Sequence, residues 1–137
     1  MNIVYSYYVL DIIHRGHLQM IQNAKGLAGP DGQLIIGILT DEAVMEKKPK
    51  PILPFVERLE IANSIKYVDL VVAQETYSPL PNIKSIKPDI LAESTSHREE
   101  DINQYREYLE SVSSKVVVLP YFPNISSTDI KSLIRNA

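Results

Sequence analysis

Five short apolar runs, separated by segments with helical periodicity, set the strongest limit on how this chain can fold. The runs are nearly continuous in apolar residues, which is typical of strands covered on both faces, as in a parallel sheet. They lie at residues 3–9, 34–39, 69–73, 89–92 and 115–119, and helical patterns occupy 16–28, 54–66, 98–112 and 127–135. The alternation predicts an α/β fold, a Rossmann-like doubly wound five-stranded parallel sheet with helices on both faces.

Length, charge and cysteine content limit the classes of function. The 137 residues suffice for one domain, which we expect to span residues 1–137. The chain has no cysteine, which excludes disulfides and thiolate metal ligands, and its net charge of −3 argues against broad nucleic-acid binding. No apolar run approaches the roughly 20 residues of a membrane span, and no signal-peptide layout is present, so we expect a cytoplasmic protein.

Two histidines follow the first predicted strand, at the point where the pattern becomes helical. They are His14 and His17, in the stretch HRGH, with Gly16 between them. In open parallel sheets ligands bind beyond the carboxyl ends of the strands, where helix N-termini favour anions. We expect Gly16 to let a ligand approach the backbone and both imidazoles to stabilise a phosphate.

Two other interpretations of the histidine pair remain open. Both residues are compatible with exposed loop histidines that have no function. A zinc site is the other alternative, although such sites usually need a third ligand. The remaining histidine, His97, has Glu99, Glu100 and Asp101 close by in the sequence.

Three hydroxyl residues stand just before the last helical pattern. Ser126, Ser127 and Thr128 occur in the stretch NISSTDIK. Any of them could serve as an ordinary N-cap, and the run could equally form a second phosphate site at a helix N-terminus. The residues alone do not decide between these two roles.

A charged run follows the second predicted strand, at the same edge of the sheet. Its acidic part begins at Thr40, and its basic part contains Lys47, Lys48 and Lys50. Charged runs are usually solvated surface. At this position Lys48 or Lys47 could instead neutralise a phosphate.

HRGH after the first strand and ISST before the last helix together resemble the HxGH nucleotidyltransferase superfamily. The nearest branch is that of the small cytidylyltransferases of the glycerol-3-phosphate type, and the domain that accompanies phosphoenolpyruvate mutase is similar. The resemblance covers nearly the whole chain, including ILTDEAVMEKK, PFVERLEIANSIKYVDLVV, PNIKSIKPDIL and VVVLPYFPNISSTDIK.

The resemblance implies transfer of CMP from CTP to a small phosphate- or phosphonate-bearing acceptor, with release of pyrophosphate. It implies that His14, His17 and Lys48 are catalytic. The nucleotide-binding residues that it implies are Val9, Leu10, Asp11, Gly16, Lys47, Arg58, Ser126, Ser127 and Thr128. It further implies a homodimer and a Mg²⁺ ion held mainly through the nucleotide phosphates.

The sequence departs from the family pattern in three places. Members commonly have Gly-Thr-Phe-Asp where this chain has Tyr8-Val9-Leu10-Asp11, and a Gly-Asp-Asp-Trp-like stretch where it has residues 93–96. The arginine that members carry before ISST is also replaced, around residues 121–123. These departures are the basis of one alternative, a non-catalytic nucleotide-binding or scaffold protein. The other alternative, within the same superfamily, is an adenylyltransferase that uses ATP.

Overall fold

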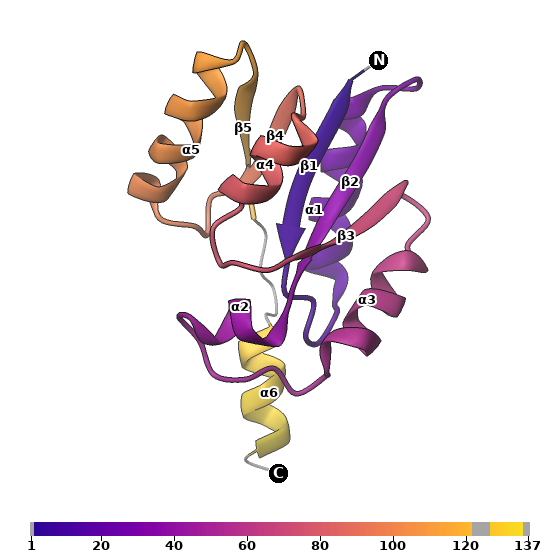
Figure 1. Cartoon of the computed structure of the whole chain (residues 1–137). Coiled ribbons are helices and arrows are strands. Elements are labelled where there is room, and N and C mark those ends of the chain that lie inside the picture. Colours follow the sequence, from indigo (N-terminus) through magenta and orange to yellow (C-terminus); the bar gives the residue numbers. More distant parts are fainter. Residues whose placement is uncertain (1, 122–126, 136–137) are drawn as a thin grey trace.

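The computed structural model describes residues 2–121 and 127–135 of the chain. Its parallel strands form one sheet in the order β3-β2-β1-β4-β5 (Figure 1). The strands are β1 (Ile3–Tyr8), β2 (Gln33–Leu39), β3 (Leu70–Gln74), β4 (Ile90–Ser94) and β5 (Lys115–Leu119). The helices are α1 (Arg15–Ala28), α2 (Asp41–Met45), α3 (Phe55–Asn63), α4 (Leu80–Ile86), α5 (Glu99–Ser111) and α6 (Ser127–Arg135).

The predicted fold class is confirmed, and the predicted elements agree with the observed ones to within three residues. Two short helices had no predicted range. The first, α2, lies in the charged run, where Thr40 caps the helix by accepting a hydrogen bond from the backbone N–H of Ala43 at 3.1 Å. The second, α4, has a proline in its first turn and is only seven residues long, which is too short for a clear helical repeat.

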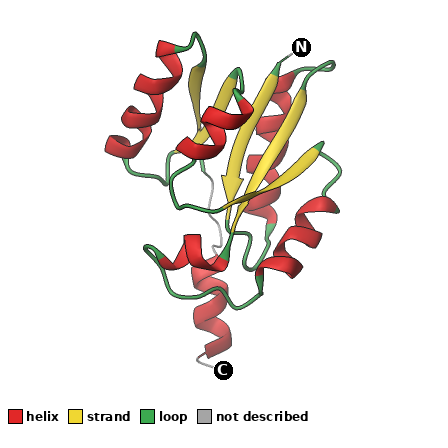
Figure 2. Cartoon of the chain, in the orientation of Figure 1, coloured by secondary structure: helices red, strands yellow, loops and turns green. Residues whose placement is uncertain are grey.

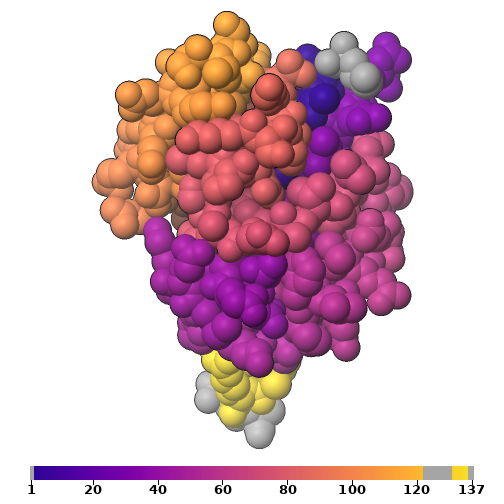
Figure 3. Space-filling view, viewed as in Figure 1, coloured from indigo at the N-terminus to yellow at the C-terminus, as the bar shows by residue number. Residues whose placement is uncertain are grey.

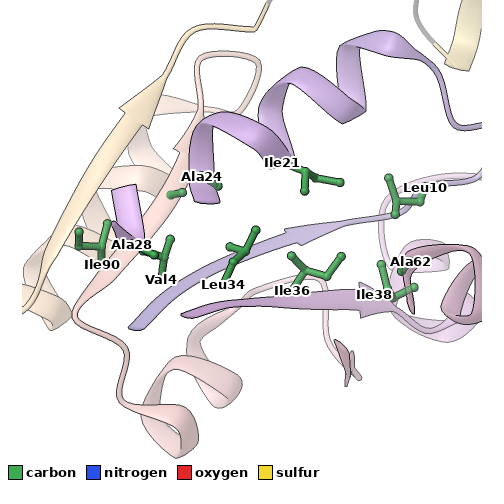
Figure 4. Packing of buried hydrophobic residues seen from close by; sticks show 11 residues of the cluster. Val4, Leu10, Ile21, Ala24, Ala28, Leu34, Ile36, Ile38, Ala62 and Ile90 are labelled. Atoms are coloured by element: carbon green, nitrogen blue, oxygen red, sulfur yellow. The ribbon is translucent and has the colours of Figure 1, made fainter. Parts of the chain in front are cut away.

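Alternate residues of the central strands face two separate cores. On one face α1 and α3 pack against the sheet, as Figure 4 shows for Ile21 and Ala24 beside Val4 and Leu34. The other face is covered by α4 and α5, whose side chains pack against Tyr5 and neighbouring strand residues. The sheet therefore lies between two helical layers (Figure 2), and burial on both faces explains why its strands are continuously apolar.

The strand order reverses between β1 and β4, which are neighbours in the sheet. Beyond their carboxyl ends lie α2 and α6, and α6 projects from that end of the molecule (Figures 1 and 3). In open α/β sheets this switch point is where ligands bind. Among the described residues, no helix is both long and apolar enough to cross a membrane.

Candidate active site

A cleft of about 720 Å³ opens at the carboxyl ends of β1 and β4. Its walls come from the β1–α1 loop, the segment after α2, the β4–α5 loop and α6. Six lysine and arginine side chains line it against three carboxylates, although the chain as a whole is acidic. The cationic residues are Lys47, Lys48, Lys50, Arg98, Lys131 and Arg135. This excess of positive charge favours an anionic ligand.

The two histidines of HRGH hold each other at the start of α1. His14 is the N-cap, and its Nδ1 accepts a hydrogen bond from the backbone N–H of Gly16 at 3.0 Å. In return, Nδ1 of His17 accepts from the backbone N–H of His14 at 3.2 Å. The two ring centroids are 4.1 Å apart. This reciprocal arrangement is a capping box built from imidazoles.

The same hydrogen bonds fix the tautomer of both rings. Because each Nδ1 accepts from a backbone N–H, each neutral ring carries its proton on Nε2. Burial lowers the pKa of His14, and burial together with the His14 ring lowers the pKa of His17 to about 4. At neutral pH both imidazoles are therefore uncharged, and each presents an Nε2–H donor.

Only His17 of the pair lines the cleft. His14 lies behind it, and its Nε2 is buried without a hydrogen-bond partner among the residues that the structure describes. Direct contact of both imidazoles with a phosphate therefore stays a prediction, and in this structure only His17 lines the cleft. His17 can contact a bound ligand directly, whereas His14 fixes the orientation of His17.

Gly16 has a different role from the one predicted. A Cβ atom at this position would lie 2.8 Å from Cε1 of His14 and 3.6 Å from Cε2 of Tyr121. The missing side chain therefore makes room for the capping imidazole, not for a ligand. Gly16 stays part of the site through the geometry of His14.

Asp11 joins the first crossover to two other parts of the site. It is only 2% exposed, and its carboxylate accepts hydrogen bonds from the backbone N–H groups of Ile52 at 2.9 Å and Leu53 at 2.8 Å. It also forms an ion pair with Lys131 of α6. Burial opposes ionisation of Asp11, but the backbone donors and Lys131 outweigh it and lower the pKa of the carboxyl. The Asp11 carboxylate is already bonded to Ile52, Leu53 and Lys131. In this arrangement Asp11 can act in nucleotide binding only indirectly, by holding these segments in place.

Arg58 is the clearest correction to the predicted site. Its side chain is 0% exposed and donates to the carbonyl oxygens of Leu53, Val9 and Leu39 at 2.7–3.0 Å. A further bond of 2.7 Å joins it to the carboxylate of Asp41. The guanidinium cross-links three loops at the sheet edge and has no surface left for a phosphate. We therefore assign Arg58 a structural role.

The predicted lysines line the cleft. Helix α2 ends at Met45, and the segment that follows carries Lys47, Lys48 and Lys50 along the cleft. The Lys47 ammonium stands 5.0 Å from the ring centroid of Tyr77. Val9 and Leu10, at the end of β1, line the same cleft, and Leu10 takes a left-handed φ of 54° where the chain turns away from the sheet.

The hydroxyl motif is only partly described. Ser126 lies outside the residues that the structure describes. Ser127 and Thr128 form the first turn of α6, where the structure describes the backbone and not their side chains. The backbone still places this turn near HRGH, because Lys131 of the same helix pairs with Asp11 and Tyr121 lies beside Gly16. The first and last crossovers therefore meet at one end of the sheet.

Among the described residues, no group of three or more histidine and carboxylate side chains could hold a metal ion. The cleft fits a Mg²⁺ ion that enters with phosphate ligands, because its cations bind phosphate and Mg²⁺ usually keeps few protein ligands. His97, considered above as a third zinc ligand, instead pairs with Glu93.

A second cluster in the cleft was not predicted. Glu93, Tyr7 and His97 contact one another at the end of β4. The signal for it was the spacing of Glu93 and His97 in ESTSH, but only the fold shows that Glu93 points into the cleft. In the sequence alone, a glutamate at the end of an apolar run indicates only that the strand ends there.

The comparisons with known proteins agree with this geometry. Residues 9–133 match the model of the cytidylyltransferase-like family. The chain belongs to that family. Its predicted membership of the HxGH nucleotidyltransferases is thereby confirmed, and the family's enzymes are nucleotidyltransferases.

The relatives include FAD synthases and bifunctional HldE proteins. An FAD synthase of Korarchaeum cryptofilum is 37% identical over 123 residues, covering 88% of this chain and 82% of the relative. The bifunctional protein HldE of Alcanivorax borkumensis is 31% identical over 98% of this chain, which spans only 28% of that protein. A lipopolysaccharide core biosynthesis protein of Thermoplasma volcanium has the same fold, with a TM-score of 0.74, 20% identity, and coverage of 89% of this chain and 97% of that one.

The departure at Tyr8 is explained by packing. In this member of the cytidylyltransferase-like family the Tyr8 side chain packs against the core between α1 and the sheet. Burial raises the pKa of its hydroxyl, which stays protonated. Tyr8 still lines the cleft, so it narrows the floor beneath a bound ligand.

Proposed function

We propose that this chain transfers a nucleoside monophosphate from a nucleoside triphosphate to a small acceptor that carries a phosphate or phosphonate group. One observation carries the proposal. A single cleft receives His17 from the first crossover, Lys48 from the segment after α2 and Lys131 from α6. Basic and hydrogen-bonding groups from three separate segments converge on a space suited to a polyanion.

The proposed reaction is an in-line displacement at the α-phosphorus. An ionised oxygen of the acceptor attacks this phosphorus, and a new P–O bond forms. The bond between the α-phosphorus and the oxygen that bridges to the β-phosphate breaks, and pyrophosphate leaves with the electron pair. No proton has to be removed from such an acceptor, so catalysis consists of positioning and charge stabilisation.

Within this reaction His17 donates from Nε2–H to the α-phosphate as negative charge builds up on it. The donor is preorganised, because the backbone N–H of His14 already holds Nδ1. Lys47 and Lys48 neutralise the triphosphate as point charges. Ser127 and Thr128, with the N-terminus of α6, bind the β- and γ-phosphates in this proposal. Mg²⁺ would supply further charge neutralisation, held by phosphate oxygens and water.

Two nucleotides are candidates. The sequence motifs resemble the CTP-dependent branch. The similarity to FAD synthase, an adenylyl transfer from ATP, favours ATP. We give ATP the first place because that similarity extends over 88% of the chain. Competition between ATP and CTP, scored as pyrophosphate release with a panel of phosphorylated acceptors that includes FMN, tests the choice. Preference for CTP would restore the cytidylyltransferase assignment.

A non-catalytic protein that only binds nucleotide is the rival interpretation. Calorimetry with Mg²⁺ and ATP or CTP separates the two, because tight binding without turnover on any acceptor would support the rival. A homodimer stays a prediction of the family resemblance, and a cytoplasmic location stays a prediction from the sequence. Sedimentation velocity measures the first, and localisation of a tagged chain measures the second.

A further inference from the structure

A buried carboxylate stands in the cleft apart from the proposed triphosphate groups. Glu93 is the fourth residue of β4 and is 1% exposed. Its Oε2 accepts a hydrogen bond of 2.7 Å from the Tyr7 hydroxyl, and its Oε1 accepts one of 3.1 Å from the backbone N–H of Ser94. The same Oε1 contacts Nδ1 of His97. Burying a carboxylate is costly unless several donors satisfy it, and Glu93 has three.

The partners of Glu93 satisfy its carboxylate oxygens, and the carboxylate in turn fixes the His97 ring. Burial and the Glu93 charge raise the pKa of Tyr7, so its hydroxyl remains a donor. The His97 ring stacks on Tyr7, with centroids 5.4 Å apart. With Nδ1–H directed at the carboxylate, the Nε2 atom of His97 is left for another group.

The His97 side chain is partly exposed and lines the cleft, which a purely structural ion pair would not require. Its side chain is 36% exposed, while that of Glu93 is buried. Both residues line the cleft, as do Arg98 and Tyr105 at the same end. The buried carboxylate of Glu93 contacts Nδ1 of His97 and thereby orients the imidazole ring.

This pair enters the cleft from the side opposite to His17. Tyr7 and Tyr105 belong to the core between the sheet and α4 and α5, whereas the first turns of α1, which carry His17, cover the other face. An in-line displacement places the attacking oxygen and the leaving pyrophosphate on opposite sides of the α-phosphorus. With the triphosphate on the His17 side of the cleft, the Glu93–His97 side is left for the acceptor.

We propose that His97, oriented by Glu93, binds the phosphate or phosphonate group of the acceptor substrate through its Nε2 atom. The inference rests on the proposed nucleotidyl transfer. The Glu93 carboxylate contacts Nδ1 and so fixes the ring, which leaves Nε2 as the nitrogen for the ligand. Glu93 is a positioning residue, since it acts through His97. The Arg98 guanidinium supplies a positive group at the same end.

Histidine-resolved NMR tests this directly, because the chain has only three histidines. The protein is labelled with 15N-histidine and saturated with Mg²⁺ and α,β-methylene-ATP, which cannot be cleaved at the reacting bond. Methylphosphonate is then titrated as the acceptor probe. We expect the nucleotide to shift the His17 signals and methylphosphonate to shift those of His97. Unmoved His97 signals with bound nucleotide would overturn the inference alone, while failure of the nucleotide to bind would overturn the proposed function as well.

Two variants extend the test. His97→Gln and Glu93→Gln should each weaken methylphosphonate binding at least tenfold and leave the dissociation constant of the nucleotide within twofold. Glu107→Gln, on the exposed side of α5 away from the cleft, is the matched control and should change neither. Equal loss of nucleotide and methylphosphonate binding in both variants would indicate a structural role and contradict the proposal.

Discussion

Lys131 of α6 forms an ion pair with Asp11, the buried aspartate of the β1–α1 loop. The same carboxylate accepts the backbone N–H groups of Ile52 and Leu53 in the segment before α3. One side chain thus connects the first crossover, the segment after the lysines and the last helix. This connection holds the walls of the cleft together before any ligand binds.

The substitution Asp11→Asn should lower the free energy of unfolding by about 1–3 kcal/mol, because a carboxamide cannot accept both backbone N–H groups and loses the ion pair. Urea unfolding measures the change. The exposed turn residue Asp31, changed to Asn, is the control and should have little effect. Since the folded pKa of Asp11 lies below 3.8, its stabilisation is present above that pH and is lost as the pH falls further. Equal acid sensitivity in Asp11→Asn and wild type would contradict this role.

The low pKa of His17 predicts a second dependence of stability on pH, at higher pH than that of Asp11. Between about 6.5 and about 4 the unfolded chain binds a proton at this residue and the folded chain does not. The free energy of unfolding should therefore decrease as the pH falls through this window. His17→Gln removes the titrating group and should flatten this part of the profile. Parallel profiles for the two proteins would mean that His17 is not held neutral.

Two glycine-to-alanine substitutions in α1 distinguish steric overlap with the His14 ring from an ordinary gain in helix propensity. A Cβ at Gly16 meets the His14 ring at 2.8 Å, whereas nothing lies within 4 Å of one at Gly26. Gly16→Ala should therefore destabilise the protein by about 1–3 kcal/mol and reduce turnover. Gly26→Ala should stabilise it by about 0.5–1 kcal/mol without a change in turnover. Thermal unfolding and pyrophosphate release measure both, and equal effects would refute the assignment of Gly16.

The tautomers of the histidines are a direct structural prediction. In the free protein at neutral pH, His14 and His17 should each carry a single proton on Nε2, because their Nδ1 atoms accept backbone hydrogen bonds. Long-range 1H–15N spectra distinguish this tautomer from the Nδ1–H form. His97 should differ from both by carrying a proton on Nδ1. An Nδ1–H form at His17 would contradict the donor role that we assign to it.

Periodicity alone was sufficient to predict most of the fold. The apolar runs located the five strands because a sheet buried on both faces leaves little room for polar residues. Helix α4 was not located, since seven residues around two prolines give no clear repeat. The edge of the sheet where ligands bind also followed from the strand–helix order, so HRGH and the lysines were assigned to the correct place.

The wrong and missing parts of the site depend on contacts between distant segments. Nothing near Arg58 in the sequence shows that the carbonyl groups of Val9 and Leu39 will enclose it. The role of Gly16 likewise depends on which way the His14 ring turns. Glu93 is buried beside Tyr7 only because β1 and β4 are neighbours in the sheet. Such pairings are set by the topology and leave no local pattern.

The central claim is that the first and last crossovers bind one triphosphate. Calorimetric titration with Mg²⁺ and ATP, and with inorganic tripolyphosphate, tests it most directly when the wild type is compared with His17→Ala and Thr128→Ala. Lys66→Ala, in the turn after α3 and outside the lining of the cleft, is the control. We predict that both site variants weaken binding of nucleotide and tripolyphosphate at least tenfold, the scale of about 1.4 kcal/mol, and that Lys66→Ala binds like the wild type. Unchanged binding in either site variant would contradict the claim.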